Sequence, residues 1–365
     1  MDRPDSDQLI RSLSGSGAPD MAAFLRQISR WCEQHNIQFD QYGEGSLITD
    51  FEAKIANLLG FPAARFMPTG VLAQLIALKI WCSERGSNHF GMHPTSHLEI
   101  HEEGGYKELY RLKGTLVGPS QSPMLAQHLE TIPSDMRVLL TELPIREVGG
   151  KLPSWMQLNE LKSAAKEHGI RLHLDGARLW ETQPFYQQSY QDICHGFDSV
   201  YVSFYKGIGA LPGAMLLGSE AFVADAKIWQ RRAGGTVQTL GPQVASAGML
   251  FDQRIADMPR FCSKARQLSM LLHSIDEIHC RPEQIQTNMM HVHLPFSARC
   301  ANAARDVVID SFGVRLFGRA IERGADASYF ELSVGVNTME IPDSEIAKMI
   351  RFFVDVASKD VQIQC

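Results

Sequence analysis

The chain has 365 residues, of which 44% are hydrophobic and 21% are charged, an ordinary balance for a globular protein large enough for two domains. Its 35 basic and 41 acidic residues give a net charge of −6, which argues against a nucleic-acid partner or an anionic membrane surface. Seven scattered cysteines without a CxxC pair predict neither a zinc site nor a disulfide framework, and they favour a cytoplasmic location.

The predicted elements alternate between strands and helices over most of the chain. The N-terminal segment to about residue 40 is polar, and its acidic first residues lack the features of a secretory signal peptide. Strands are expected at 137–142 and 170–174, on either side of a helix over 155–168. The runs SVYVSF and GAMLLG follow as two further strands around a glycine-rich turn. This order predicts an α/β fold with a mostly parallel sheet.

The C-terminal third has a different pattern. Residues 240–275 are expected to be helical, with a break at Pro259. A strand at 287–294 comes next, and helix, strand and helix complete the chain. We therefore expect a large domain over residues 1–275, which includes the N-terminal segment, and a small α+β domain over residues 276–365.

Asp175 lies in the run HLDGAR, at the end of a predicted strand and before a turn that begins with Gly176. Ligands of α/β sheets bind beyond the carboxyl ends of the strands. A carboxylate at this point could hold a metal, a ribose or a protonated ring nitrogen. The alternative, which the motif taken alone favours, is that Asp175 caps the following helix.

Lys206 follows the apolar run SVYVSFY and precedes three closely spaced glycines. An ammonium group that leaves a buried strand loses hydration, which lowers its pKa and makes the amine a better nucleophile. Taken alone, the position also suits a lysine whose ammonium reaches solvent from a strand end.

The turn Phe66–Val71 (FMPTGV) leads into an apolar helix. Its backbone N–H groups and the positive end of the helix dipole form a potential phosphate site. A plain loop with Thr69 as the N-cap is the alternative. A phosphate site, a strand-end aspartate and a strand-end lysine are together the groups that hold pyridoxal phosphate (PLP). The three motifs therefore predict PLP as the cofactor.

These motifs resemble those of the threonine aldolase and β-eliminating lyase family of fold-type I PLP enzymes. HLDGAR and SFYKGIGALPGAMLLG match the family's aspartate and lysine motifs closely. Shorter matches occur in the family's order over residues 40–300, namely YGEG, MPTG, HPTSHLEIHEEGG, ELPIREVGG and TNMMHV. The resemblance implies a large domain with a mostly parallel seven-stranded sheet, and lyase chemistry on a small amino acid.

The resemblance also implies roles for individual residues. Lys206 would carry the cofactor as a Schiff base, Asp175 would pair with the pyridine nitrogen, and His97 would stack on the ring and assist proton transfer. Arg178 would face the phenolic oxygen of the cofactor and the carboxylate of the substrate. A buried structural histidine and a surface ion pair are the alternatives for His97 and Arg178. Phosphate contacts are expected from Thr69, Gly70, Val71 and Ser203.

Four departures from the family pattern fall in the expected substrate site. Ile145 stands where the family's ENTH motif has histidine, and Tyr205 stands where the family favours serine. Residues 328–338 contain no arginine to bind a substrate carboxylate, and residues 231–238 lack the family's arginine before the glutamine. Arg146 is the candidate to bind the carboxylate instead, with an exposed loop arginine as the alternative.

The fold type implies an active site at a subunit interface. Tyr42 and Glu44, in the run YGEG, would then line the pocket of a neighbouring subunit in a homodimer or homotetramer. No metal site is predicted, because the dispersed histidines do not form a ligand pattern on a helix. We interpret this set as structural: His89, His93, His101, His291 and His293.

The reaction that these features favour is retro-aldol cleavage of a β-hydroxy amino acid to glycine and an aldehyde. The first alternative is β-elimination, or another PLP lyase reaction, on a serine- or cysteine-like amino acid, with Lys206 as the base at Cα. A PLP-binding protein with little turnover is the second. A nicotinamide-dependent dehydrogenase is not expected, because no GxGxxG follows an early strand.

Overall fold

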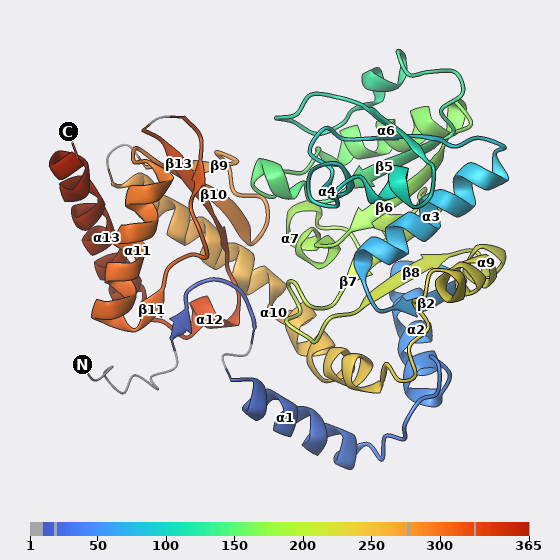
Figure 1. Cartoon of the computed structure of the whole chain (residues 1–365), viewed down its shortest axis with the longest axis horizontal. Helices are drawn as coiled ribbons and strands as arrows, with labels where there is room; N and C mark the ends of the chain where they lie inside the picture. The colour runs from blue at the N-terminus through green and yellow to red at the C-terminus, as the bar shows by residue number, and fades with distance from the viewer. Residues whose placement is uncertain (1–9, 18–19, 276–277, 325, 365) are drawn as a thin grey trace. The chain divides into compact units, whose positions relative to one another are not determined.

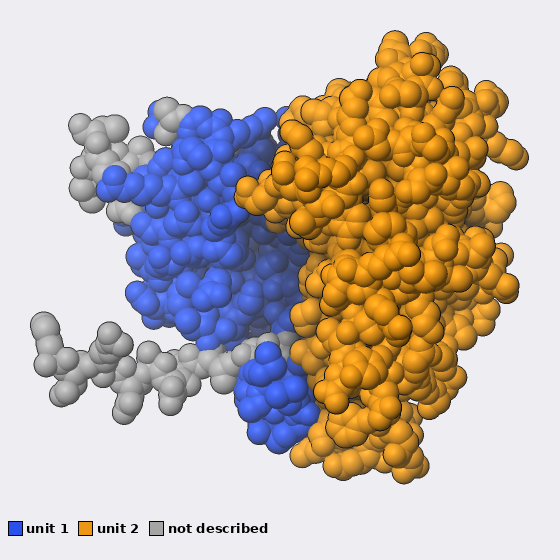
Figure 2. Space-filling model, turned by 45° about the vertical axis from the view of Figure 1, so that its right-hand side comes forward, with its two compact units in different colours: residues 1–27, 257–365 blue, residues 28–256 orange. Residues whose placement is uncertain are grey.

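The computed structural model describes residues 10–17, 20–275, 278–324 and 326–364. It divides into two compact units, residues 28–256 (unit 2) and residues 1–27 with 257–365 (unit 1), which Figure 2 shows in different colours. The sequence predicted a boundary near residue 275 and placed the N-terminal segment in the large domain. In the structure, residues up to 27 group with the C-terminal part, and β1 (Arg11–Ser12) pairs in parallel with β11 (Val314–Arg315), while residues 28–40 belong to unit 2.

Unit 2 is built on the predicted mostly parallel seven-stranded sheet (Figure 1). Only β8 runs antiparallel to both of its neighbours. The strands in spatial order are β2 (Ala63–Met67), β8 (Ala214–Gly218), β7 (Ser199–Ser203), β6 (Arg171–Gly176), β5 (Val138–Glu142), β3 (His89–Met92) and β4 (Lys113–Leu116).

Helix α3 (Gly70–Glu84) lies along one face of this sheet and contacts β2, β3 and β5 to β8. Its side chains are apolar on all sides, as expected of a helix buried between a sheet and another helix, here α9 (Glu220–Arg232). The remaining helices of this unit include α2 (Ser46–Leu59), α4 (His97–Ile100), α5 (Gly105–Glu108), α6 (Trp155–Glu167), α7 (Gln183–Tyr186) and α8 (Tyr190–Cys194), with 3₁₀ turns at Ala126–Leu129, Arg146–Val148 and Leu179–Glu181.

The alternation of β7 separates two environments. Ser199 and Tyr201 face α3, because the Ser199 hydroxyl accepts a hydrogen bond from Trp81 Nε1 at 2.7 Å and Tyr201 packs on Gly70. Phe204 lies on the opposite side, in an aromatic cluster with Phe51, Phe66, Trp180 and Phe251. The aromatic cluster therefore packs on one side of the chain at β7, and α3 contacts Ser199 and Tyr201 on the other side.

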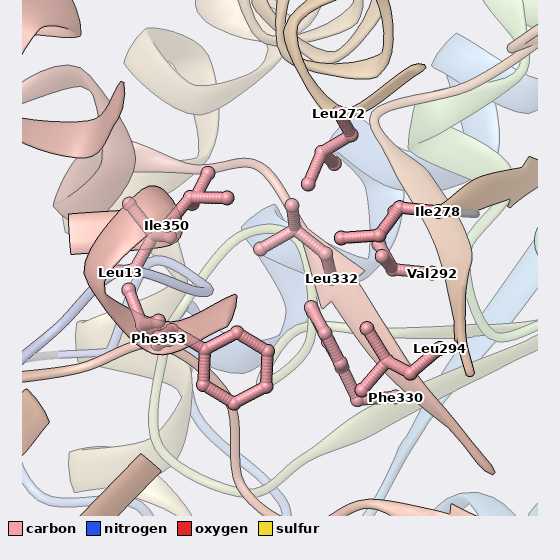
Figure 3. A pocket seen from close by; sticks show the side chains of 10 residues that line it. Leu13, Leu272, Ile278, Val292, Leu294, Phe330, Leu332, Ile350 and Phe353 are labelled. Atoms are coloured by element: carbon pink, nitrogen blue, oxygen red, sulfur yellow. The ribbon is translucent and has the colours of Figure 1, made fainter. Parts of the chain in front are cut away.

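Unit 1 contains a four-stranded antiparallel sheet with helices packed on it. The strands in order are β12 (Ile321–Glu322), β13 (Ser328–Ser333), β10 (Met289–Leu294) and β9 (His279–Arg281). The helices include α11 (Ala298–Phe312), α12 (Val336–Met339) and α13 (Asp343–Gln364). Figure 3 shows a cavity of about 10 Å³ in its core, lined by apolar side chains such as Leu272, Val292 and Phe353. That volume holds at most about one water, so the cavity is a packing gap and no ligand site.

The predicted break at Pro259 is wrong. Helix α10 runs uninterrupted from Gly241 to His273. Proline removes a single backbone donor from such a helix, and the buried neighbours Met258 and Phe261 hold the surrounding turns against the core. Helix α1 (Met21–Gln34) completes the elements, and none of the described helices is long and apolar enough to cross a membrane.

Gly70 is the first residue of α3, after the N-cap Thr69, whose hydroxyl accepts a hydrogen bond from the Leu72 N–H at 3.2 Å. A Cβ atom at Gly70 would overlap the hydroxyl group and ring of Tyr201. Tyr201 is 2% exposed and belongs to the core beneath α3. The start of α3 can therefore approach the sheet this closely only with glycine.

We expect Gly70→Ala to lower the free energy of unfolding by about 1–3 kcal/mol, because the buried tyrosine must move to make room. Chemical denaturation followed by circular dichroism measures the change. Gly105→Ala is the matched control, since a Cβ there meets only Leu75 Cδ1 at the ordinary distance of 3.9 Å. Equal stability of both variants would show that the Tyr201 contact is not tight.

Candidate active site

Three neighbouring strands end at one edge of the sheet, and each brings a charged side chain to it. Glu142 ends β5 and lies in register with Asp175 near the end of β6, which in turn lies in register with Tyr201 on β7. Lys206 follows β7 by three residues. Because these strands are parallel, their carboxyl ends meet at the edge where ligands bind in such sheets.

Asp175 is 2% exposed and accepts hydrogen bonds from the Ala177 backbone N–H at 3.0 Å and from the side chain of Gln74 on α3. Burial raises the pKa of its carboxyl, while the positive charge of Lys206 and these hydrogen bonds oppose the rise. The structure therefore surrounds Asp175 with groups that stabilise its ionised form.

Lys206 lies within electrostatic range of both carboxyls. Burial lowers the pKa of its ammonium, Arg178 lowers it further, and Asp175 and Glu142 raise it. Its Nζ lies 5.6 Å from the centre of the Tyr205 ring. A lysine with a lowered pKa has more of its amine in the neutral, nucleophilic form.

His97 begins α4, and its Nδ1 lies 2.8 Å from Glu102 Oε1. Burial lowers the pKa of His97 to about 4, with further contributions from Lys206, His101, Arg146 and Arg178. The imidazole is therefore neutral near pH 7, and its Nδ1–H donates to Glu102. These charges place His97 in the same cluster as Lys206.

The two arginines predicted for the site also belong to this cluster. Arg178 acts electrostatically on Lys206, His97 and Asp175. Arg146 follows β5 and acts on Lys206 and His97, while its Nη1 lies 2.9 Å from Glu147 Oε1. Its side chain is 31% exposed, so Arg146 lies at the rim of the cluster with part of its guanidinium accessible.

The predicted phosphate residues lie at the N-terminus of α3, which is 15 residues long. Thr69 is exposed, and Gly70 and Val71 form the first turn of the helix, so their N–H groups point out of its positive end. Ser203 is buried, and its hydroxyl donates to the Ala177 carbonyl at 2.7 Å. A phosphate contact from Ser203 requires exchange of that bond.

The position of Tyr42 differs from those of the predicted site residues around Lys206. It is 57% exposed, in a turn where its N–H donates to the Gln238 carbonyl at 2.8 Å. Its neighbour Glu44 pairs with Lys227 at 2.5 Å. Among the described residues, the hydrogen bonds and ion pairs of this turn do not involve the cluster around Lys206, so its role in another subunit stays a prediction.

Sequence reasoning missed several polar residues at the site. Glu142 and Gln74 each carry a buried side-chain oxygen without a hydrogen-bond partner among the described residues. Tyr201 donates its hydroxyl proton to Tyr205. The end of the run RVLLTE could have indicated Glu142, because its strand neighbours that of Asp175. Gln74 is the polar exception among the buried residues of α3.

His101 was interpreted as structural, but it lies beside the cluster. Its ring centre is 4.8 Å from that of His97, and its Nε2 lies 2.9 Å from Glu147 Oε1. In the part of the chain that the structure describes, no group of three or more His, Cys, Asp or Glu side chains could hold a metal ion. The cluster is thus built from carboxyls, amines and imidazoles that bind one another.

Comparison with known proteins agrees with this geometry. Residues 26–295 match the family model described as beta-eliminating lyase. A crystal structure from Listeria monocytogenes, named for L-allo-threonine aldolase activity, is 39% identical, with a TM-score of 0.89 over 95% of this chain and 96% of that one. A low-specificity L-threonine aldolase of Arabidopsis thaliana is 26% identical over 72% of this chain and 76% of its own.

More distant structures agree in fold alone. The serine palmitoyltransferase of Sphingomonas wittichii is 14% identical, with a TM-score of 0.70 over 96% of this chain and 87% of that one. The fold-type I architecture predicted from the sequence is therefore confirmed. With the family model covering most of the chain, the resemblance seen in the motifs is also confirmed: this protein belongs to the beta-eliminating lyase family.

Proposed function

We propose that this protein is a PLP-dependent lyase that cleaves a β-hydroxy amino acid by a retro-aldol reaction, to glycine and an aldehyde. The observation that carries the proposal is that Asp175 and Lys206 leave adjacent parallel strands at one edge of the sheet, within electrostatic range of each other. The names of the Listeria and Arabidopsis relatives, both threonine aldolases, support this choice of reaction.

The residues present fit PLP at both of its ends. Near Asp175, the buried oxygens Glu142 Oε2 and Gln74 Oε1 have no partner among the described residues, and buried polar atoms in proteins generally have one. At the other end, the first turn of α3 offers backbone N–H groups to a phosphate, and Gly70 lets this turn lie close to the sheet against Tyr201. When bound, PLP supplies the electron sink that makes bonds at the substrate Cα labile.

Three side chains of the site have separate roles in the proposed reaction. The hydrogen bonds from Ala177 and Gln74 stabilise the ionised form of Asp175, which would place a negative charge against the pyridine nitrogen. His97 donates through Nδ1 to Glu102, so its Nε2 carries the lone pair that can accept the proton of the β-hydroxyl group. Lys206, with its lowered pKa, binds the cofactor covalently.

β-Elimination is the second candidate, and Ile145 is the observation that favours it. This residue replaces the family's histidine, is 3% exposed, and donates its N–H to the Lys151 carbonyl at 2.9 Å. It therefore offers no base near the β-hydroxyl group. Elimination needs a base only at Cα, which Lys206 can provide.

Incubation with L-allo-threonine, L-threonine and L-serine distinguishes the two reactions. We expect glycine and acetaldehyde from the first two, and a change in the absorbance of the bound cofactor on adding each. Ammonia and a keto acid from L-serine would indicate elimination instead. Borohydride reduction followed by peptide mapping should find the cofactor on Lys206, and Lys206→Ala should abolish the label. Lys166→Ala, on the exposed side of α6, is the control.

We also propose that Arg146 binds the substrate carboxylate. Residues 328–338 provide no arginine, and Arg146 lies at the carboxyl end of β5, within electrostatic range of Lys206. Glu147 holds one nitrogen of the guanidinium, which orients the group. A planar guanidinium can bind a carboxylate through two parallel hydrogen bonds.

Arg146→Ala should weaken amino-acid binding at least roughly tenfold, because a charge-assisted hydrogen bond contributes about 1.5–3 kcal/mol. The absorbance of the cofactor without substrate should stay unchanged. Arg146→Lys should recover only part of the loss, since an ammonium cannot bind bidentately. Arg137→Ala, at the amino end of the same strand, is the control. Titration of each variant with substrate measures the affinity, and an unchanged affinity in Arg146→Ala would contradict the role.

We further propose that the chain forms a cytoplasmic homodimer or homotetramer in which Tyr42 completes the site of a neighbouring subunit. Two aromatic side chains in this region, Phe39 at 87% and Tyr42 at 57% exposure, are available for contact. The described cysteines are free, which agrees with a reducing compartment.

Mixing two inactive variants tests this arrangement. In the proposed dimer, each site takes Lys206 from one subunit and Tyr42 from the other. A hybrid of one Tyr42→Ala subunit and one Lys206→Ala subunit therefore has one intact site and one site that lacks both residues. Equal mixing should restore roughly a quarter of the wild-type activity in a two-fold symmetric dimer. Sedimentation velocity should show a dimer or tetramer throughout. A fully active monomer would contradict the proposal, as would a mixture that stays inactive.

A further inference from the structure

Two carboxyl groups lie side by side at the edge of the sheet. Glu142 and Asp175 are partners in the parallel pairing of β5 and β6. Neighbouring strands are roughly 4.8 Å apart, and residues in register extend from the same face. The charge of Asp175 acts on Glu142 and raises its pKa, and Glu142 Oε2 is inaccessible to solvent. Two buried carboxylates on neighbouring strands repel each other strongly if both are ionised.

The hydrogen bonds around the two carboxyls favour a different protonation state for each. Asp175 accepts from the Ala177 N–H and the Gln74 side chain, and Lys206 is its largest electrostatic partner. Glu142 accepts one bond, from the Arg146 backbone N–H to Oε1 at 3.1 Å, and its Oε2 accepts none from the described residues. Donors stabilise the ionised form of a carboxyl, so the charge belongs on Asp175 and the proton on Glu142.

Resting on the proposed function, we propose that Glu142 is a positioning residue that carries the single proton of the Glu142–Asp175 pair. It thereby keeps one negative charge, rather than two, facing the pyridine nitrogen of the cofactor. The proton stays on Oε2 throughout, so no transfer step is involved. The role differs from that of Asp175, which itself contacts the cofactor.

The other charged groups around Glu142 are consistent with a neutral side chain. Burial raises its pKa to about 8, and Asp175 on β6 adds to the rise. Arg178, Lys206 and the Arg146 N–H act in the opposite direction and do not cancel it. Glu142 also raises the pKa of Lys206 when it is ionised. Loss of its proton would therefore keep the lysine protonated and hinder its reaction with the cofactor.

Infrared spectroscopy of the complete chain, with and without PLP, tests the protonation directly. We expect a carbonyl stretch of a protonated carboxylic acid at pH 7 that disappears as the pH rises through about 8. The band should be missing from Glu142→Gln and present in Glu147→Gln. In Asp175→Asn its midpoint should move down by about one pH unit or more, because the neighbouring charge is gone.

Stability against pH provides a second readout. The folded-state pKa of Glu142 lies above the unfolded value of about 4.3, so its protonated form stabilises the fold fully below that pH. This contribution is lost as the pH rises through the folded value. Between about pH 5 and 8, the ratio of the folding equilibrium constants of wild type and Glu142→Gln should fall by up to roughly tenfold per pH unit. A merely structural glutamate would give parallel profiles.

Three results would contradict a protonated Glu142. A carboxylate band for Glu142 at pH 6, an unmoved midpoint in Asp175→Asn, or parallel stability profiles would overturn the proposal. None of these readouts needs turnover. Failure of borohydride labelling at Lys206 would refute the proposed function while leaving the infrared titration interpretable, so the two failures are distinguishable.

Discussion

The rest of the site depends on one constraint. Charged side chains are buried away from water at the carboxyl ends of β5, β6 and β7. A charge loses hydration when buried, and it persists only where partners compensate for that loss. Asp175 receives such partners from a turn and a helix, and Glu142 receives fewer. Two arginines and two carboxyls act on the charge of Lys206. The protonation state of each group therefore depends on its neighbours as much as on its own chemistry.

Helix α3 ties this charge balance to the sheet. Its first turn carries the proposed phosphate site, Gln74 donates to Asp175 one turn later, and Trp81 donates to Ser199 further along the helix. Ser199 also lies 2.8 Å from His173 Nδ1, so a row of hydrogen bonds runs along the helix–sheet contact. The packing of α3 on the sheet thus fixes the distance between the two ends of the proposed cofactor site.

The candidate site residues that the sequence alone could indicate are those in local motifs. Asp175 and Lys206 stand out because each follows an apolar strand and precedes glycine, and their strands could be recognised without tertiary information. Glu142 requires the register of β5 against β6, which becomes visible only in three dimensions. Pro259 was misjudged for the same reason, since a local rule predicted a break where packing maintains the helix. The role of Tyr42 depends on a second chain and stays a prediction.

The pairing of β1 with β11 bears on the order in which the chain folds. Arg11 also bonds Glu345 at the start of α13, so the N-terminal strand is fixed by residues more than 300 positions later. Unit 2, residues 28–256, is by contrast one continuous segment. Domains generally fold as units during synthesis from the N-terminus. The sheet of unit 2 can therefore form before β11, the partner of β1, has been synthesised. Unit 1 can complete its fold only after α13 has been synthesised, so it assembles late. Its assembly brings the first residues of the described chain into contact with the C-terminal helix.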